Sequence, residues 1–254
     1  MILTGKQIMS GHSKWHSIKH QKAAADAKRG AAFTKLANAI TIAAKQGGGD
    51  PVVNFKLRLV MGKARSANMP QANIERAIKK GTGELGGAQV EEILYEGYGP
   101  GAVAILVEVA TDNRNRAASE VRSAFTKHGG RLAEAGAVAF QFEQKGQIVL
   151  NQTGDEAELA AIDAGADDMN EEDGKLYVYT PAAKLDQVRS ALAAQNRPID
   201  SAELAYIPRT SVTISDRKIL NQLIAIMETL DDLDDVTETY ANFEVAGELE
   251  LAEQ

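Results

Sequence analysis

The 254-residue sequence contains no cysteine, which excludes disulfides, zinc–thiolate centres and a cysteine nucleophile. Aromatic residues make up only 5% of the chain, and it has a single tryptophan, Trp15. No apolar run approaches the roughly 18 to 20 residues that a membrane helix needs, and the first residues lack the apolar core of a signal peptide. These absences predict a cytoplasmic protein that has no membrane partner.

Charge is divided unevenly along the chain, although the whole carries a modest net charge of -7. Residues 1–80 hold 15 Lys and Arg against three acids, a net charge of +12, whereas residues 81–254 hold 13 against 32, a net charge of -19. Such asymmetry indicates a polyanionic partner for the basic part. The alternative is that the two oppositely charged parts simply attract each other.

The basic part is expected to form three helices. Residues 33–44 carry an apolar stripe at helical spacing, which ends in a run of three glycines. Asp50 and Pro51 are typical of an N-cap and a first helical residue, so a second helix is predicted to begin there. Pro70 suits the start of a third helix, which Gly81 ends. Since helices this short need one another to bury their apolar faces, we predict a compact three-helix domain.

Strands alternate with single helices through the rest of the chain. Two strands joined by a Gly-Pro-Gly turn are predicted over 91–110, a helix over 113–130, and a hairpin over 138–150 that turns at Lys145 and Gly146. This alternation indicates an α+β multidomain protein, in which a basic three-helix N-terminal domain is followed by two small α/β sandwich domains. Further helices are expected over 155–164, 181–194 and 215–230, and further strands from residue 176, near 202–207 and near 236–243.

Three patterns that could carry chemistry have simpler explanations. GTGELG over 81–86 matches the dinucleotide pattern G-x-G-x-x-G but follows a helix and precedes a strand, the reverse of what such a site needs, so we interpret it as a linker. His12, His16 and His20 recur every four residues, yet neighbouring glycine and serine disfavour a helix and no carboxylate lies among them. The acidic run 231–235 is interpreted as a solvated helix end rather than a cation or hydrolase site. No G-x-S-x-G elbow surrounds any serine, so we predict no catalytic residue, no cofactor and no metal.

The stretch from 11 to 30 combines five Lys or Arg residues with one acid, Trp15 and three of the four histidines. Basic side chains can neutralise phosphates and release counterions, and aromatic rings can stack on exposed bases. The alternative for Trp15 is a hydrophobic anchor against the helical domain. Arg114 and Arg116, at a strand-to-helix junction, could hold a phosphate or could serve in capping and ion pairs. The predicted nucleic-acid-binding residues are Lys14, Trp15, His16, Lys19, His20, Lys22, Lys28, Arg29, Lys35, Lys56, Lys63, Arg65, Arg114 and Arg116.

Three long motifs carry a resemblance to a known family: GHSKWHSIKHQKAAADAKRGAAFTKL, NMPQANIERAIKKGTG and YEGYGPGAVAILVEVATDNRNR. They resemble the YebC family, whose mitochondrial relative is the translational activator of cytochrome oxidase, and the similarity covers nearly the whole chain. The family starts just before the first motif, so Met9 is expected as the translation start in place of Met1. The resemblance implies three domains, the third inserted into the second: an extension and basic arm over 1–20, a helical domain over 21–82, a middle domain over 83–133 plus 203–247, and an insert over 134–202.

Members of this family are described both as DNA-binding transcriptional regulators and as ribosome-associated factors that assist translation. We therefore expect a non-enzymatic, nucleic-acid-binding regulator of gene expression, with ribosomal RNA, transfer RNA or DNA as its partner. A ribosome-associated translation factor is the first expectation, because no clear helix-turn-helix is evident and the acidic body would be repelled from extended duplex. A DNA-binding transcriptional regulator is the alternative, since a basic three-helix unit can also fill a major groove. An enzyme that uses acidic clefts between domains is the competing class.

Overall fold

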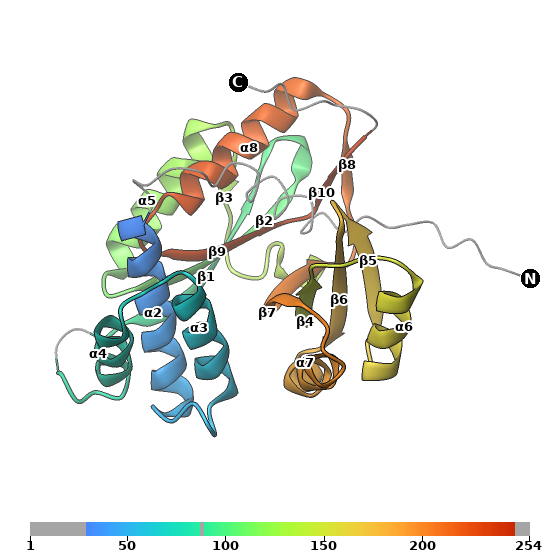
Figure 1. Cartoon of the computed structure of the whole chain (residues 1–254). Coiled ribbons are helices and arrows are strands. Elements are labelled where there is room, and N and C mark those ends of the chain that lie inside the picture. The colour runs from blue at the N-terminus through green and yellow to red at the C-terminus, as the bar shows by residue number, and fades with distance from the viewer. Residues whose placement is uncertain (1–28, 87–88, 247–254) are drawn as a thin grey trace, which may run out of the picture. The chain divides into compact units, whose positions relative to one another are not determined.

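The computed structural model describes residues 29–86 and 89–246, and Figure 1 shows their helices and strands. They form two compact units, one of which comprises residues 142–211 and 242–244, while the other comprises the remaining described residues. Both units combine helices with antiparallel strands, so the predicted α+β fold class is confirmed. Within the described ranges, every helix is too short or too polar to cross a membrane.

The basic part forms the three helices that its apolar spacing predicts: α2 (Arg29–Gly47), α3 (Phe55–Ser66) and α4 (Gln71–Gly81). Fully burying one large apolar side chain contributes roughly 1.5–3 kcal/mol, which offsets the weak intrinsic stability of helices this short. The three helices share one core, to which each contributes side chains that are at most 5% exposed: Ile40, Leu57, Met61, Ile74 and Ala77.

The second helix begins at Phe55, and the prediction that it begins at Asp50 and Pro51 is wrong. Asn54 is the N-cap, since its side-chain oxygen accepts a hydrogen bond from the backbone N–H of Leu57 at 3.0 Å. The Asn54 amide also donates to two backbone carbonyls around the end of α2. This buried side chain ties α2 to α3, and a tertiary contact of this kind overrides the local helix-start pattern.

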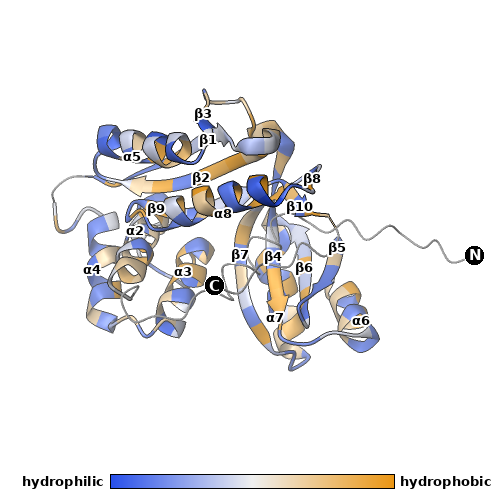
Figure 2. Cartoon of the chain, turned by 90° about the horizontal axis from the view of Figure 1, so that it is seen from above, coloured by the Kyte–Doolittle hydropathy of each residue, from blue (hydrophilic) through white to orange (hydrophobic). Residues whose placement is uncertain are grey.

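A four-stranded antiparallel sheet of order β3-β1-β2-β9 lies in the same unit as these helices. α5 (Arg114–Lys127) and α8 (Arg217–Asp231) pack on one face, where a side chain at Gly97 would meet Phe125 of α5. α2 packs on the other face (Figure 1) through a small apolar cluster with the sheet. β2 is therefore buried on both sides and is hydrophobic along most of its length (Figure 2). The strands are β1 (Glu91–Tyr98), β2 (Ala104–Thr111), β3 (Arg131–Leu132) and β9 (Val236–Ala241).

The other unit is built on a second antiparallel sheet, of order β5-β6-β4-β7. Its elements follow the chain in the order strand, helix, strand, strand, helix, strand, which is that of a ferredoxin-like domain. Both helices lie on the same face, because α6 and α7 contact each other and the central strand β6. The elements are β4 (Phe142–Leu150), α6 (Asp155–Ala164), β5 (Asp168–Glu172), β6 (Lys175–Pro181), α7 (Leu185–Ala194) and β7 (Ile199–Pro208).

β4 is one continuous strand, so the predicted hairpin that turns at Lys145 and Gly146 is wrong. The strand pairs with β6 on one side and with β7 on the other, and this double pairing keeps both residues extended. Gly146 is required there by packing, since a Cβ atom at this position would lie 2.8 Å from the Cβ of Leu185 in α7. A glycine that marks a close approach can thus be mistaken for one that marks a turn.

The remaining predicted helices and strands are present, but four strands were missed, of which β3 has only two residues. β5 has the sequence DMNEE, whose acidic residues are not typical of a strand. The short strands β8 (Val212–Ile214) and β10 (Phe243–Val245) pair only with each other.

Gly81 lets α4 approach α2 closely. A Cβ atom at position 81 would lie 2.3 Å from the carbonyl oxygen of Thr41, so Gly81→Ala is expected to separate the helices. We expect the free energy of unfolding to fall by roughly 1–3 kcal/mol, measured by urea or thermal unfolding. Gly62 of α3 is the matched control, since no atom lies within 4 Å of a Cβ placed there. Gly62→Ala should stabilise by about 0.5–1 kcal/mol through helix propensity, and equal effects of the two changes would contradict the packing argument.

Candidate nucleic-acid interface

The predicted contact residues have different surroundings in the structure. Arg65 is exposed, Arg114 is mostly exposed, and Lys35, Lys56, Lys63 and Arg116 make bonds within the protein. The remaining predicted residues lie outside the described residues, or have a side chain that does, and stay predictions: Lys14, Trp15, His16, Lys19, His20, Lys22, Lys28 and Arg29.

Lys56 and Lys63, both on α3, point at carboxylates of the first sheet. Lys56 Nζ lies 3.1 Å from Glu92 Oε1 on β1, and Lys63 Nζ lies 3.1 Å from Glu238 Oε1 on β9. By the strand registers, Glu92 and Glu238 lie on the sheet face that α2 covers, together with Glu108 of β2. These five residues are called the lysine–carboxylate interface below. Two of its three carboxylates have a lysine partner.

Glu108 is the central carboxyl group of this interface and lies directly opposite Glu238 in the β2–β9 register. Its Oε2 accepts a hydrogen bond from the hydroxyl of Tyr240 at 3.1 Å. Burial, and secondarily the negative charges of Glu238 and Glu92, raise the pKa of Glu108 to about 7 from an ordinary value of 4.5. In the folded protein Glu108 therefore keeps its proton at pH values at which an exposed glutamate is ionised.

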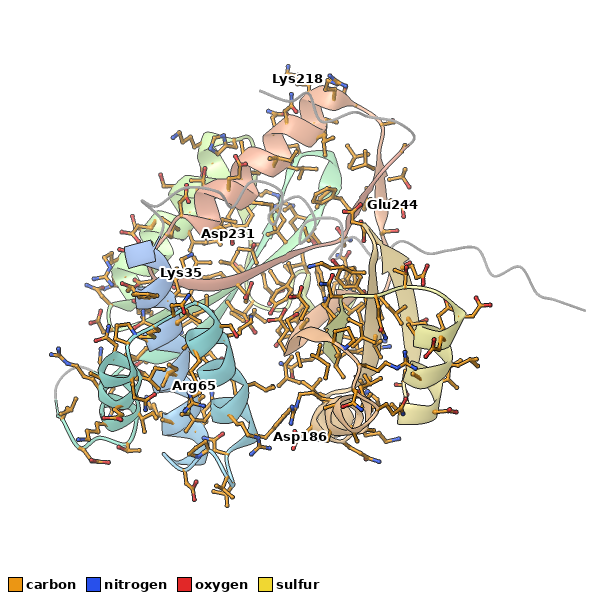
Figure 3. The ribbon with its side chains drawn as sticks, in the orientation of Figure 1. Lys35, Arg65, Asp186, Lys218, Asp231 and Glu244 are labelled. Carbon is orange, nitrogen blue, oxygen red and sulfur yellow. The ribbon has the colours of Figure 1, made fainter. Side chains whose placement is uncertain are left out.

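Two lysines of α2 also bond to backbone carbonyls elsewhere in the same unit. Lys35 Nζ donates to the backbone carbonyl of Asp231 at the end of α8, and Figure 3 shows these two residues next to each other. Lys45 Nζ donates to the backbone carbonyl of Val90 at 3.0 Å. Three lysines of the helical part thus bond to the sheet or to the residue just before it, and Lys35 bonds to the end of α8.

Four other cations of the helical part have no carboxylate partner among the described residues. None of them forms an ion pair with any residue of 29–86 or 89–246. Arg65, labelled in Figure 3, lies in the last turn of α3, whereas Arg76, Lys79 and Lys80 are spaced three and four residues apart on one face of α4. The sequence analysis missed the three α4 residues, although the pair of lysines before Gly81 could have indicated them. We call Arg65, Arg76, Lys79 and Lys80 the free basic set.

Arg116 is held by carboxylates at the start of α5, where the preceding asparagine caps the helix. Its Nη2 lies 2.7 Å from Asp235 Oδ2 and 3.3 Å from Asp112 Oδ1. The hydrogen bond and the charge of Asp235 raise the pKa of the Arg116 guanidinium. Arg114 is 73% exposed at its side chain and lies 4.0 Å from Glu91. The structure therefore gives Arg116 the ion-pairing arrangement that the sequence analysis considered, and leaves Arg114 open to solvent.

Family models account for nearly the whole chain. One described as the TACO1/YebC protein N-terminal domain matches residues 13–84, and one described as the TACO1/YebC second and third domain matches residues 90–243. The chain belongs to the TACO1/YebC family. The expected resemblance to YebC is thereby confirmed, and the N-terminal family model ends just after α4 and the free basic set.

Curated TACO1/YebC relatives from bacteria match over almost their full length. The chain is 53% identical to the "Probable transcriptional regulatory protein GSU1074" of Geobacter sulfurreducens over 242 residues, which cover 94% of this chain and 98% of the relative. It is 50% identical to a "Probable transcriptional regulatory protein" of Syntrophobacter fumaroxidans over 244 residues, 95% of this chain and 98% of the relative. The names of these relatives describe regulators, and none is an enzyme name.

A solved crystal structure matches the fold as well. The crystal structure of the conserved hypothetical protein Aq1575 from Aquifex aeolicus superposes with a TM-score of 0.86 at 44% sequence identity. The match covers 93% of this chain and 98% of that chain. The helical part and both sheets therefore follow an architecture that has been observed experimentally.

Glu108→Gln tests the buried carboxyl of the lysine–carboxylate interface. The pKa of Glu108 is raised from 4.5 to about 7 in the folded state, so the stability from its proton is complete below pH 4.5 and is lost as the pH rises through 7. The free energy of unfolding of the wild type should therefore fall by roughly 2–3 kcal/mol on account of Glu108 as the pH rises from 4.5 to above 7. The variant stays neutral and can still accept from Tyr240, so it should not show this loss. Urea unfolding at a series of pH values measures the difference, and parallel pH profiles would contradict it.

Arg116→Ala and Arg114→Ala separate ion pairing from phosphate binding. Arg116→Ala leaves the Asp235 carboxylate, 11% exposed, without its cation, so the melting temperature should fall. Arg114→Ala is the matched control and should change the melting temperature little. Nucleic-acid affinity, measured by fluorescence anisotropy, is expected to survive Arg116→Ala. A loss of affinity at unchanged melting temperature would instead assign Arg116 to phosphate.

Proposed function

We propose that this protein is a non-enzymatic, nucleic-acid-binding regulator of gene expression that acts on transcription by binding duplex DNA. The names of its relatives support the transcriptional alternative over the ribosome-associated role that the sequence analysis put first. The strongly basic first 80 residues, with a net charge of +12, support a polyanionic ligand.

The free basic set carries this proposal. Arg76, Lys79 and Lys80 are neighbours on one face of α4, and like charges at this spacing destabilise a helix. The helix dipole favours cations in the last turn, which explains Lys79 and Lys80 but not Arg76 in the middle of the helix. A phosphate backbone would neutralise all three. The repulsion between these three cations in the free protein is then offset when the nucleic acid binds.

The lysine–carboxylate interface does not offer comparable contacts. Lys56 and Lys63 already have Glu92 and Glu238 as counterions, so a phosphate would have to displace a carboxylate at each. Such half-exposed pairs are individually weak, at roughly 0.2–1 kcal/mol, but they also hold α3 against the sheet. We therefore propose that DNA contacts the free basic set and that Lys56 and Lys63 serve attachment.

Contacts of this type bind phosphate without choosing a base sequence. Each neutralised phosphate releases counterions, so affinity should fall steeply with salt, with a slope that reports how many cations take part. The acidic remainder of the chain, at net charge -19, would repel DNA and confine it to the basic helices.

Two sets of substitutions test the proposal. The fourfold change of Arg65, Arg76, Lys79 and Lys80 to Gln should weaken binding to a labelled duplex of about 20 base pairs by at least tenfold, and should lower the salt slope by roughly one unit or less per residue. The matched control is Lys56→Gln with Lys63→Gln, which removes two cations. This control should lower the melting temperature but leave the affinity for the duplex nearly unchanged. Fluorescence anisotropy between about 50 and 200 mM salt measures the affinity and the salt slope of each variant, and thermal unfolding measures the melting temperature.

A labelled RNA hairpin of the same length distinguishes the two regulatory roles. Preference for the duplex DNA supports action on transcription, whereas tighter binding of the hairpin would overturn it in favour of a translational role. Unchanged binding in the fourfold variant would overturn the assignment of the free basic set.

A further inference from the structure

Helix α6 has an unusual distribution of apolar side chains. Its buried face consists only of alanines, Ala157, Ala160, Ala161 and Ala164, whereas the two large apolar residues, Leu159 and Ile162, are 60% and 56% exposed. A surface helix ordinarily places its largest apolar residues toward the core. Small residues on the inner side let α6 pack closely, but they do not explain why larger ones stand outside.

Carboxylates surround this exposed pair. Asp155, Glu156 and Asp163 are one helical turn away from Leu159, and Glu158 is one turn before Ile162. Glu156 pairs with Arg197 at 2.8 Å, while the other three carboxylates form no ion pair with a described residue. No Lys or Arg occurs between residues 154 and 174, which contain nine Asp and Glu. The exposed face of α6 is therefore apolar at its centre and negative at its rim.

Two of these residues, Ile162 and Asp163, are unfavourable for the stability of α6. The helix dipole favours acids in the first turn, which accounts for Asp155, Glu156 and Glu158, but it disfavours Asp163 near the C-terminal end. Helix propensity accounts for Leu159, but Ile162 is β-branched and loses rotamer freedom in a helix. Neither Ile162 nor Asp163 stabilises α6 from within.

We propose that the exposed face of α6 is a docking surface for a basic amphipathic helix of another protein, in which Lys and Arg flank an apolar stripe. The apolar stripe would cover Leu159 and Ile162, and the cations would meet the surrounding carboxylates. A nucleic acid does not fit this face, because phosphates would be repelled. A second copy docked through the same face does not fit either, since it would place carboxylates against carboxylates.

A synthetic helical peptide of about 18 residues, with a leucine stripe flanked by Lys and Arg, serves as the probe. Ile162→Ala and Asp163→Gln should each weaken its binding to the full-length protein at least threefold, and Leu159→Ala with Ile162→Ala at least tenfold. Ile162→Ala and Asp163→Gln should also keep or raise the melting temperature, because Ala and Gln are better helix formers. A merely structural role would lower it. Val52→Ala with Val53→Ala is the matched control, since these valines are 79% and 77% exposed in the other unit.

Two altered peptides complete the test, measured by fluorescence anisotropy. Replacing the cations by Gln, or the leucines by Ser, should each weaken binding at least tenfold. Equal binding of wild type and the α6 variants, or equal weakening by the valine control, would overturn the proposal. Self-association of the protein that Ile162→Ala abolishes would also overturn it, because the occupant would then be this chain's own basic part. Duplex DNA binding should be the same in all α6 variants. Failure of the α6 docking proposal can therefore be distinguished from failure of the proposed DNA-binding function.

Discussion

The attachment of the basic helices to the first sheet depends on neutralising charge between them. Glu92, Glu108 and Glu238 share one face of the sheet, but only Lys56 and Lys63 reach it from α3. An unpaired charge inside such an interface would cost several kcal/mol. The remaining carboxyl, Glu108, avoids this cost by holding a proton, with Tyr240 donating to it. Two lysines and one proton thus balance these three carboxyl groups, and this balance lets the short helix α3 rest on the sheet.

This arrangement divides the cations of the helical part by function. Lysines that bond within the unit, including Lys35 and Lys45, hold it together. The free basic set keeps its charge available. The net charge of +12 over the first 80 residues therefore overstates what a ligand can contact. In the second unit, α6 carries acids around exposed apolar side chains, and residues 154–174 contain no lysine or arginine.

Local patterns were enough to predict much of the fold, including the β1–β2 pair, α5 and α6, because periodicity and turn residues act within a few positions. The predictions failed where a distant contact decided the outcome. Asn54 caps α3 because it also bonds to the end of α2, and Lys145 and Gly146 stay extended because β4 pairs on both sides. The same limit applies to the site. A lysine in a basic sequence looks available for phosphate, and only the fold shows that Lys63 has met Glu238, 175 residues further along.

That separation also matters while the chain is being made. Synthesis at about 5–20 residues per second leaves an interval of roughly 9–35 seconds between the addition of Lys63 and that of its carboxylate partner. β9, which carries Glu238 and Tyr240, is likewise the last strand of its sheet to be added. During this interval Lys63 is present beside a translating ribosome and its messenger without its intramolecular counterion. The final strand therefore completes the sheet and also supplies the carboxylate that withdraws Lys63 from the polyanions around a nascent chain.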